Sequence, residues 1–139
     1  MNAKPPSYVL DSFALLSHLQ DESGSGRVLA LLKQAQIGDC RLSLSLINLG
    51  EICYLIERRR GIRAVYLTLA SIENLPVEIL PADRDAVLAA AHLKANYPIS
   101  YADAFAAAAA LSCPAILLTA DPEFERLANT IQIEWLPIS

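Results

Sequence analysis

The alternation of short apolar segments with longer amphipathic ones is the feature that most constrains the fold of this chain. Short apolar runs predict strands at residues 8–10, 41–44, 77–80, 115–118 and 131–135. Segments with the helical period of apolar residues separate these runs. Strands joined by helical crossovers form parallel sheets that helices cover on both faces. The sequence therefore predicts an α/β fold with a central, mostly parallel sheet of four to five strands.

Capping residues and chain breakers set the limits of the predicted helices. Ser45 caps one helix, Gly61 ends it, and Pro76 ends the next. The predicted helices cover residues 12–19, 28 to near 38, 46–60, 62–75, 83–95, 100–111 and 121 to about 129. With 139 residues the chain has the usual size of one domain, and we expect residues 1–139 to form a single domain.

The composition limits the classes of protein to consider. Apolar residues make up 54% of the chain and charged residues 19%, which excludes a disordered or fibrous protein. The longest apolar run, residues 104–111, is far shorter than the ~20 residues of a membrane span. The first residues lack the apolar core of a secretory leader, so we expect a cytoplasmic location. Three cysteines without a C-x-x-C pair and two distant histidines argue against disulfides and zinc.

The charges are distributed unevenly along the chain. The net charge is −4, so no global basic field attracts a nucleic acid. Four of the eleven Lys and Arg residues lie between Arg58 and Arg63 and form the single basic cluster of the sequence. Two interpretations of this cluster stay open: a solvated helix end whose cations suit the helix dipole, or an edge that contacts phosphates.

Three aspartates lie where a helix is predicted to begin. Asp11 directly follows the first predicted strand, and Asp121 follows the fourth after two intervening residues. Asp103 follows Ser100 at the start of an alanine-rich helix that we expect to be buried. Each of these positions also suits helix capping. Because ligands of parallel α/β sheets bind beyond the carboxyl ends of the strands, the three aspartates are candidate site residues as well.

Glu51 is an acidic residue that capping does not explain. Its helical neighbours Ile47, Tyr54 and Leu55 are apolar or aromatic, so we expect a buried carboxylate. An unpaired buried carboxylate is costly, which favours a nearby cation; the alternative is a bent helix that exposes Glu51. Several acids at one sheet edge are tolerable where hard cations bind, and oxygen ligands suit Mg²⁺ and Mn²⁺.

Four segments carry a resemblance to a known family. They are YVLDS at residues 8–12, Ser45 with Glu51 six residues later, SYADA at residues 100–104 and LLTADPEF at residues 117–124. In this order and spacing, the chain resembles the PIN-domain family over nearly its whole length. Within that family it is most similar to the VapC-type toxin ribonucleases of type II toxin–antitoxin systems. The resemblance implies a three-layer α/β/α fold with a parallel sheet between helices.

The resemblance also implies a site and an activity. Asp11, Glu51, Asp103 and Asp121 would bind one or two Mg²⁺ or Mn²⁺ ions, with the Thr119 hydroxyl beside them. The implied activity is endonucleolytic cleavage of RNA. Implied partners are the RNA substrate, a second copy of the chain in a homodimer, and a cognate VapB-like antitoxin that inhibits the toxin.

Three other functions stay open on the sequence. A PIN-like domain without catalysis could serve as an RNA-binding or interaction module, although all four acids are present. A phospho-acceptor receiver domain is also α/β, but it needs a lysine after a late strand where this chain has Asp121. A flap-type nuclease or a phosphatase would use similar metal ligands.

Overall fold

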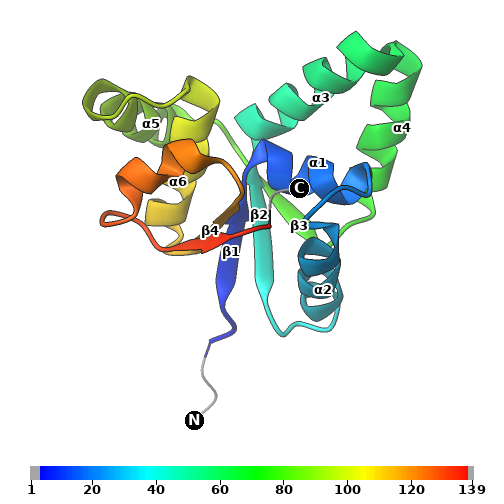
Figure 1. Ribbon diagram of the computed structural model, residues 1–139, viewed down its shortest axis with the longest axis horizontal. Helices are drawn as coiled ribbons and strands as arrows, with labels where there is room; N and C mark the ends of the chain where they lie inside the picture. The colour runs from blue at the N-terminus through cyan, green and yellow to red at the C-terminus, as the bar shows by residue number, and fades with distance from the viewer. Residues whose placement is uncertain (1–3, 138–139) are drawn as a thin grey trace.

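The computed structural model describes residues 4–137, and its centre is a five-stranded sheet in which all neighbouring strands are parallel. The strand order is β3-β2-β1-β4-β5, so β1 is the middle strand (Figure 1). The strands are β1 Ser7–Leu10, β2 Arg41–Ser45, β3 Val77–Leu80, β4 Ile116–Thr119 and β5 Ile133–Trp135. The predicted α/β fold with a mostly parallel sheet is confirmed.

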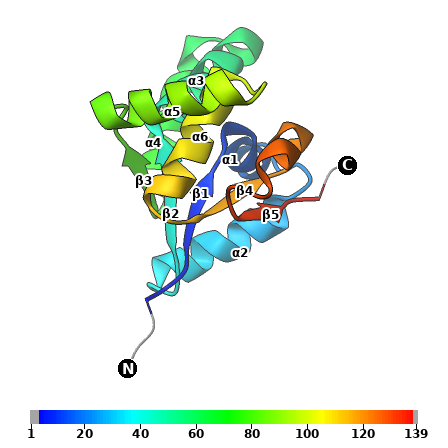
Figure 2. The same cartoon turned by 90° about the vertical axis from the view of Figure 1, so that its left-hand side faces the viewer.

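Helices cover both faces of this sheet, as two views at right angles show (Figure 1 and Figure 2). They are α1 Ser12–Leu19, α2 Ser25–Gln36, α3 Leu46–Arg60, α4 Ile62–Glu73, α5 Arg84–Asn96, α6 Tyr101–Ser112 and the 3₁₀ helix η1 Pro122–Leu127. Side chains of α1 to α4 form one apolar core with one face of the sheet. Side chains of α5, α6 and η1 form a second core with the other face.

The two central strands are buried on both faces. Tyr8 and Leu10 of β1 pack in the first core, and Val9 packs in the second. Leu117 and Leu118 of β4 divide between the two cores in the same way. Leu10 pairs with Leu118 in the parallel ladder, so β1 and β4 end at nearly the same level. Residues that follow these two strands therefore meet at one edge of the sheet.

Most predicted elements are confirmed to within a few residues, but the last predicted helix is wrong in type. Residues Pro122–Leu127 form a 3₁₀ helix in place of an α-helix over 121–129. The side chains of Phe124 and Leu127 are both fully buried, and a period of three residues per turn brings them to one face. Among residues 4–137, no helix combines the length and the apolar character needed to cross a membrane.

Helix α6 lies against the sheet through small side chains. It contacts β1, β2 and β4 on one side and α3 and α5 on others. Ala104, Ala106 and Ala107 are fully buried, and Phe105 and Ala108 nearly so. Small side chains let the backbones approach closely, so the position of the first turn of α6 relative to the sheet is set by dense packing.

We expect the substitution Ala107→Leu to lower the free energy of unfolding by about 1–3 kcal/mol, because a fully buried alanine in a dense core leaves no space for a larger side chain. Ala109→Leu is the matched control on the same helix. Ala109 is half-buried and lines an open hollow, so the control should cost less than about 0.5 kcal/mol. Urea unfolding measures both values, and equal losses would contradict the packing argument.

Candidate metal centre

The candidate site lies at the carboxyl ends of the two central strands. From β1 the sheet continues to β2 and β3 on one side and to β4 and β5 on the other. The boundary between β1 and β4 is thus a topological switch point, where parallel sheets open a crevice for ligands. Asp11 follows β1 here and Thr119 is the last residue of β4, and their side chains are in contact.

Asp11 has a fully buried carboxyl group that accepts two hydrogen bonds. The Thr119 hydroxyl donates to its Oδ2 at 2.5 Å, and the backbone N–H of Ala14 donates to its Oδ1 at 2.7 Å. The second bond makes Asp11 the N-cap of α1, as its capping interpretation predicts. Burial raises the pKa of Asp11 to about 6, although both hydrogen bonds lower it, and the charges of Asp121 and Glu51 raise it further.

Asp103 lies in the first turn of α6 and is 5% exposed. Its backbone N–H donates to the Ser100 hydroxyl at 3.1 Å, which caps the helix. Burial raises the pKa of Asp103 to about 8, and the charge of Asp121, a hydrogen bond with Glu123 and the charge of Asp11 add to the rise. In the absence of a cation, this group of acids therefore retains a proton at neutral pH.

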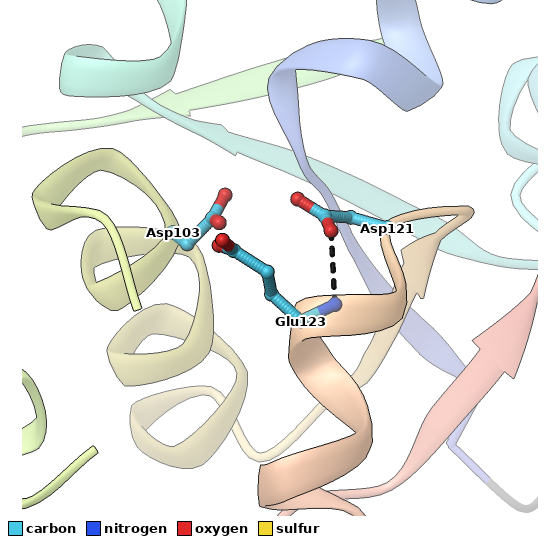
Figure 3. Close-up of side chains that lie close together, drawn as sticks. All are labelled: Asp103, Asp121 and Glu123. Atoms are coloured by element: carbon cyan, nitrogen blue, oxygen red, sulfur yellow. Dashed lines mark hydrogen bonds between the residues drawn. The ribbon is translucent and has the colours of Figure 1, made fainter. Parts of the chain in front are cut away.

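Asp121 and Glu123 come from the segment that follows β4. The Glu123 N–H donates to Asp121 Oδ1 at 2.9 Å, and the Asp121 N–H donates to Thr119 Oγ1 at 3.0 Å. Asp121 is thus the N-cap of η1, with Pro122 at the first position. Figure 3 shows the side chains of Asp103, Asp121 and Glu123 directed toward one another.

Asp103, Asp121 and Glu123 are termed the acidic cluster below. Each offers one carboxylate oxygen, and the three oxygens lie within 4.8 Å of one another. Within the described part of the chain, this is the one group of three such ligands. Carboxylate oxygens are the donors that Mg²⁺, Mn²⁺ and Ca²⁺ prefer, so the acidic cluster could hold a hard divalent cation.

Sequence analysis missed Glu123. The residue follows Asp121 by two positions, and in an ordinary α-helix such a spacing turns two side chains to different faces. In η1 the Asp121 carboxylate caps the Glu123 N–H, and the two acids reach the same ligand position. The sequence does contain a signal for Glu123. It is an acid in the first turn of a predicted helix, and the cap of that helix, Asp121, was already a candidate ligand.

Glu51 lies at the rim of the site and outside the acidic cluster. It is half-buried, and the Tyr54 hydroxyl donates to its Oε2 at 3.4 Å. The expectation of a buried carboxylate is therefore wrong, because Ile52 and Ile56 form the core face of α3 and Glu51 lies one position to the side. Its charge nevertheless raises the pKa of Asp11, and α3, which carries Glu51, begins directly after β2 at the same edge of the sheet.

Asn48, which sequence analysis also missed, links three helices behind the acids. Its fully buried side chain donates from Nδ2 to the Ser12 hydroxyl at 3.1 Å and to the Ala102 carbonyl at 3.2 Å. The Ser12 hydroxyl donates in turn to the Asn48 backbone carbonyl at 3.3 Å. Ser12 follows Asp11 and Ala102 precedes Asp103, so this network holds the backbones of the two buried acids in place. The sequence signal that could have revealed Asn48 is a polar residue on the buried face of a predicted helix.

In a comparison with protein families, one family model covers most of this chain. A family model described as PIN domain matches residues 8–130, an interval that includes all the acidic residues of the candidate site. No curated protein sequence matches the chain.

Solved structures with a similar fold come from bacterial toxin–antitoxin systems. A chain of VapBC2 from Rickettsia felis, bound to a DNA fragment from their promoter, has a TM-score of 0.73 and 18% identity; the alignment covers 94% of this chain and 99% of that one. VapC20 from Mycobacterium tuberculosis, a sarcin-ricin loop cleaving toxin, has a TM-score of 0.69 and 21% identity, with 94% and 99% covered. A chain of a toxin–antitoxin complex from Klebsiella pneumoniae has a TM-score of 0.61 and 20% identity; the alignment covers 91% of this chain and 95% of that one. At these identities the likeness shows a common fold.

We predict that the metal-free protein loses stability as the pH rises from about 4 to about 8. Asp11 and Asp103, with pKa values raised from 3.8 to about 6 and about 8, keep protons in the folded state that the unfolded state releases. Where the folded state binds more protons, the free energy of unfolding falls with rising pH. Thermal melts in EDTA should show Tm several degrees lower at about pH 8 than at about pH 5, since ~1 kcal/mol corresponds to roughly 3–5 °C at this size.

The variant Asp103→Asn tests the cause of this pH dependence. It removes one ionisation, so it should be more stable than the wild type at about pH 8 and should depend less on pH. Asp83→Asn is the matched control, because Asp83 is an exposed N-cap of α5 outside the acidic cluster and asparagine preserves the cap. Identical pH profiles for Asp103→Asn and the wild type would contradict the electrostatic argument.

We expect Asn48→Ala to lower the free energy of unfolding by about 2–4 kcal/mol, because it removes the side-chain hydrogen bonds to the Ser12 hydroxyl and the Ala102 carbonyl and leaves a cavity at a fully buried position. Asn96→Ala is the matched control, since Asn96 bonds only the His92 carbonyl of its own helix and is exposed. The control should change stability by less than about 0.5 kcal/mol. Chemical denaturation that gave equal losses would show that the Asn48 network does not stabilise the site.

Proposed function

The chain belongs to the PIN-domain family, and from this premise we propose that it is a divalent-metal-dependent endoribonuclease. The observation that carries the proposal is the acidic cluster, which lies beside the buried Asp11 at the carboxyl edge of the central strands. VapC20, which shares the fold, is a sarcin-ricin loop cleaving toxin. Hydrolysis of a phosphodiester bond in RNA is the reaction that a carboxylate-bound cation in this position supports best.

Mg²⁺ or Mn²⁺ suits the donors of the site. The acidic cluster contains only carboxylate oxygens, without the thiolate or imidazole ligands that select softer metals. We assign ion binding to the acidic cluster and Asp11, with Glu51 at the rim available for a second ion. When bound, such an ion activates a water for attack on phosphorus and offsets the charge of the leaving oxygen.

The residues of the chain position this chemistry through one hydroxyl group. Thr119 donates to Asp11 and accepts the backbone N–H of Asp121, so it fixes two carboxyl groups relative to each other. Asp103 approaches them from the other side, on a helix that is densely packed against the sheet. A ligand set held by hydrogen bonds and packing needs little rearrangement to bind an ion.

We further propose that the chain is the toxin of a type II toxin–antitoxin pair, forms a homodimer and binds a VapB-like antitoxin. A toxin–antitoxin complex from Klebsiella pneumoniae contains a chain of this fold. Both kinds of interface need exposed apolar surface. Large apolar or aromatic side chains are exposed on this chain, among them Phe13, Leu46, Leu88 and Tyr101.

Cleavage of a mixed cellular RNA pool tests the nuclease proposal. The protein should cut RNA with Mg²⁺ or Mn²⁺ and should not cut in EDTA. Asp11→Asn, Asp103→Asn and Glu123→Gln should each lower kcat by about 100-fold or more, because each removes a proposed metal ligand. Asp83→Asn should cut like the wild type.

Thermal melts with added Mn²⁺ provide a readout independent of cutting. The ion should raise the Tm of the wild type at about pH 8 and should raise that of Asp103→Asn much less, since ligand binding to the folded state stabilises it. Absence of both cutting and stabilisation would overturn the proposal and favour an interaction module. Undiminished cutting in EDTA would overturn the metal dependence alone.

A further inference from the structure

Helix α3 (Figure 1) begins directly after β2, at the sheet edge where the site lies, and its last turn carries three of the four arginines of the basic cluster. Glu51, Tyr54 and Arg58 lie along it and are termed the α3 stripe. We propose that a single-stranded segment of RNA crosses the α3 stripe on its way into the site, with a base stacked on Tyr54 and a phosphate paired with Arg58. This inference rests on the proposed nuclease function and assigns substrate-binding residues to it.

The members of the α3 stripe face the same side of the helix. Residues three, four and seven positions apart share one face of an α-helix, and Arg58 lies about 10 Å beyond Glu51 along the axis. Two contacts join the stripe. The Tyr54 hydroxyl donates to Glu51 Oε2 at 3.4 Å, and the guanidinium carbon of Arg58 lies 4.9 Å from the centre of the Tyr54 ring. The stripe is therefore continuous from the rim of the site to the basic end of α3.

Tyr54 and Arg58 are accessible to a ligand. Tyr54 is 46% exposed and Arg58 is exposed, whereas Ile52 and Ile56 provide the apolar contacts of α3 with the core. An aromatic ring at an exposed position offers every base a surface for stacking, independent of sequence. An arginine beside it can donate two parallel hydrogen bonds to a phosphate.

The charge distribution calls for a local cation where RNA binds the protein. With a net charge of −4 and carboxyl groups around the site, the protein repels a polyanion unless a local cation compensates. Arg58 shares the face of Glu51. Its neighbours point elsewhere: Arg59 lines a hollow between α1 and α3, and Arg60 lines another that α4 also borders. Among the arginines of α3, Arg58 is thus the one directed along the path to the site.

Binding of a fluorescently labelled, mixed-sequence single-stranded RNA of ~20 nucleotides tests the inference. The parent is Asp103→Asn with Mg²⁺, which should cut the probe at least about 100-fold more slowly than the wild type. Tyr54→Ala and Arg58→Ala should each weaken binding about tenfold, equal to ~1.4 kcal/mol. Tyr54→Phe keeps the ring and should change binding less than about twofold. Arg59→Ala is the matched control, the same deletion on another face of α3, and should weaken binding less than about threefold.

Salt dependence and kinetics separate this role from a structural one. Arg58→Ala should reduce the slope of log K against log salt by about 0.7, the value for one lost phosphate contact on a single strand. In the cutting enzyme, Tyr54→Ala and Arg58→Ala should raise KM about tenfold and change kcat less than about twofold. Loss of a metal ligand has the opposite pattern, so failure of the α3 stripe is distinguishable from failure of the nuclease proposal.

Three outcomes would overturn the inference. The first is equal weakening by Arg58→Ala and Arg59→Ala, which would indicate general electrostatic attraction. The second is unchanged RNA binding by both Tyr54→Ala and Arg58→Ala, or no RNA binding by the parent. The third is that Arg58→Ala weakens the binding of a protein partner and leaves RNA binding intact, which would assign this surface to the protein partner.

Discussion

Burial of several carboxyl groups beside one another at one edge of the sheet is the constraint on which the rest of the structure depends. Asp11 and Asp103 are buried beside other acids, and their pKa values rise to about 6 and about 8. Each unit of such a rise corresponds to ~1.4 kcal/mol between the two protonation states. A site of this kind costs stability until a proton or a cation compensates its charge, so the surrounding fold must supply that stability elsewhere.

The fold meets this cost with two apolar cores and with hydrogen bonds that serve the site and the scaffold together. The Asp11 side chain caps α1 and also accepts a hydrogen bond from the Thr119 hydroxyl. The Asp121 side chain caps η1 and also belongs to the acidic cluster. Asn48 joins the starts of α1 and α6 from behind, through Ser12 and Ala102. Capping and ligand binding are therefore compatible interpretations of these aspartates. Fixing the helix starts also fixes the carboxyl groups, which is the preorganisation that a metal site requires.

Features set by local sequence were predictable, and features set by three-dimensional packing were not. The limits of α3 follow from the Ser45 cap and the Gly61 break, and the apolar runs locate the strands. The exposure of Glu51 depends on which of two adjacent helical stripes faces the core, and both contain apolar residues. Glu123 joins the acidic cluster at the turn that begins η1, where the Asp121 carboxylate accepts the Glu123 N–H. Neither the choice of stripe nor the type of turn is determined by spacing in the sequence alone.

The arrangement of charge along α3 reconciles an acidic protein with a polyanionic substrate. Cations at the carboxyl end of a helix are favourable in their own right, so the arginines there need no further compensation. Arg58 lies about 10 Å from Glu51 along the axis, a distance comparable to the Debye length of ~10 Å at 0.1 M salt, so screening does not isolate it from the site. Ionised acids of the cluster would repel phosphates bound at Arg58, and a cation bound by these acids would reduce that repulsion. Because such coupling is reciprocal, RNA on the α3 stripe and a cation in the acidic cluster should strengthen each other's binding.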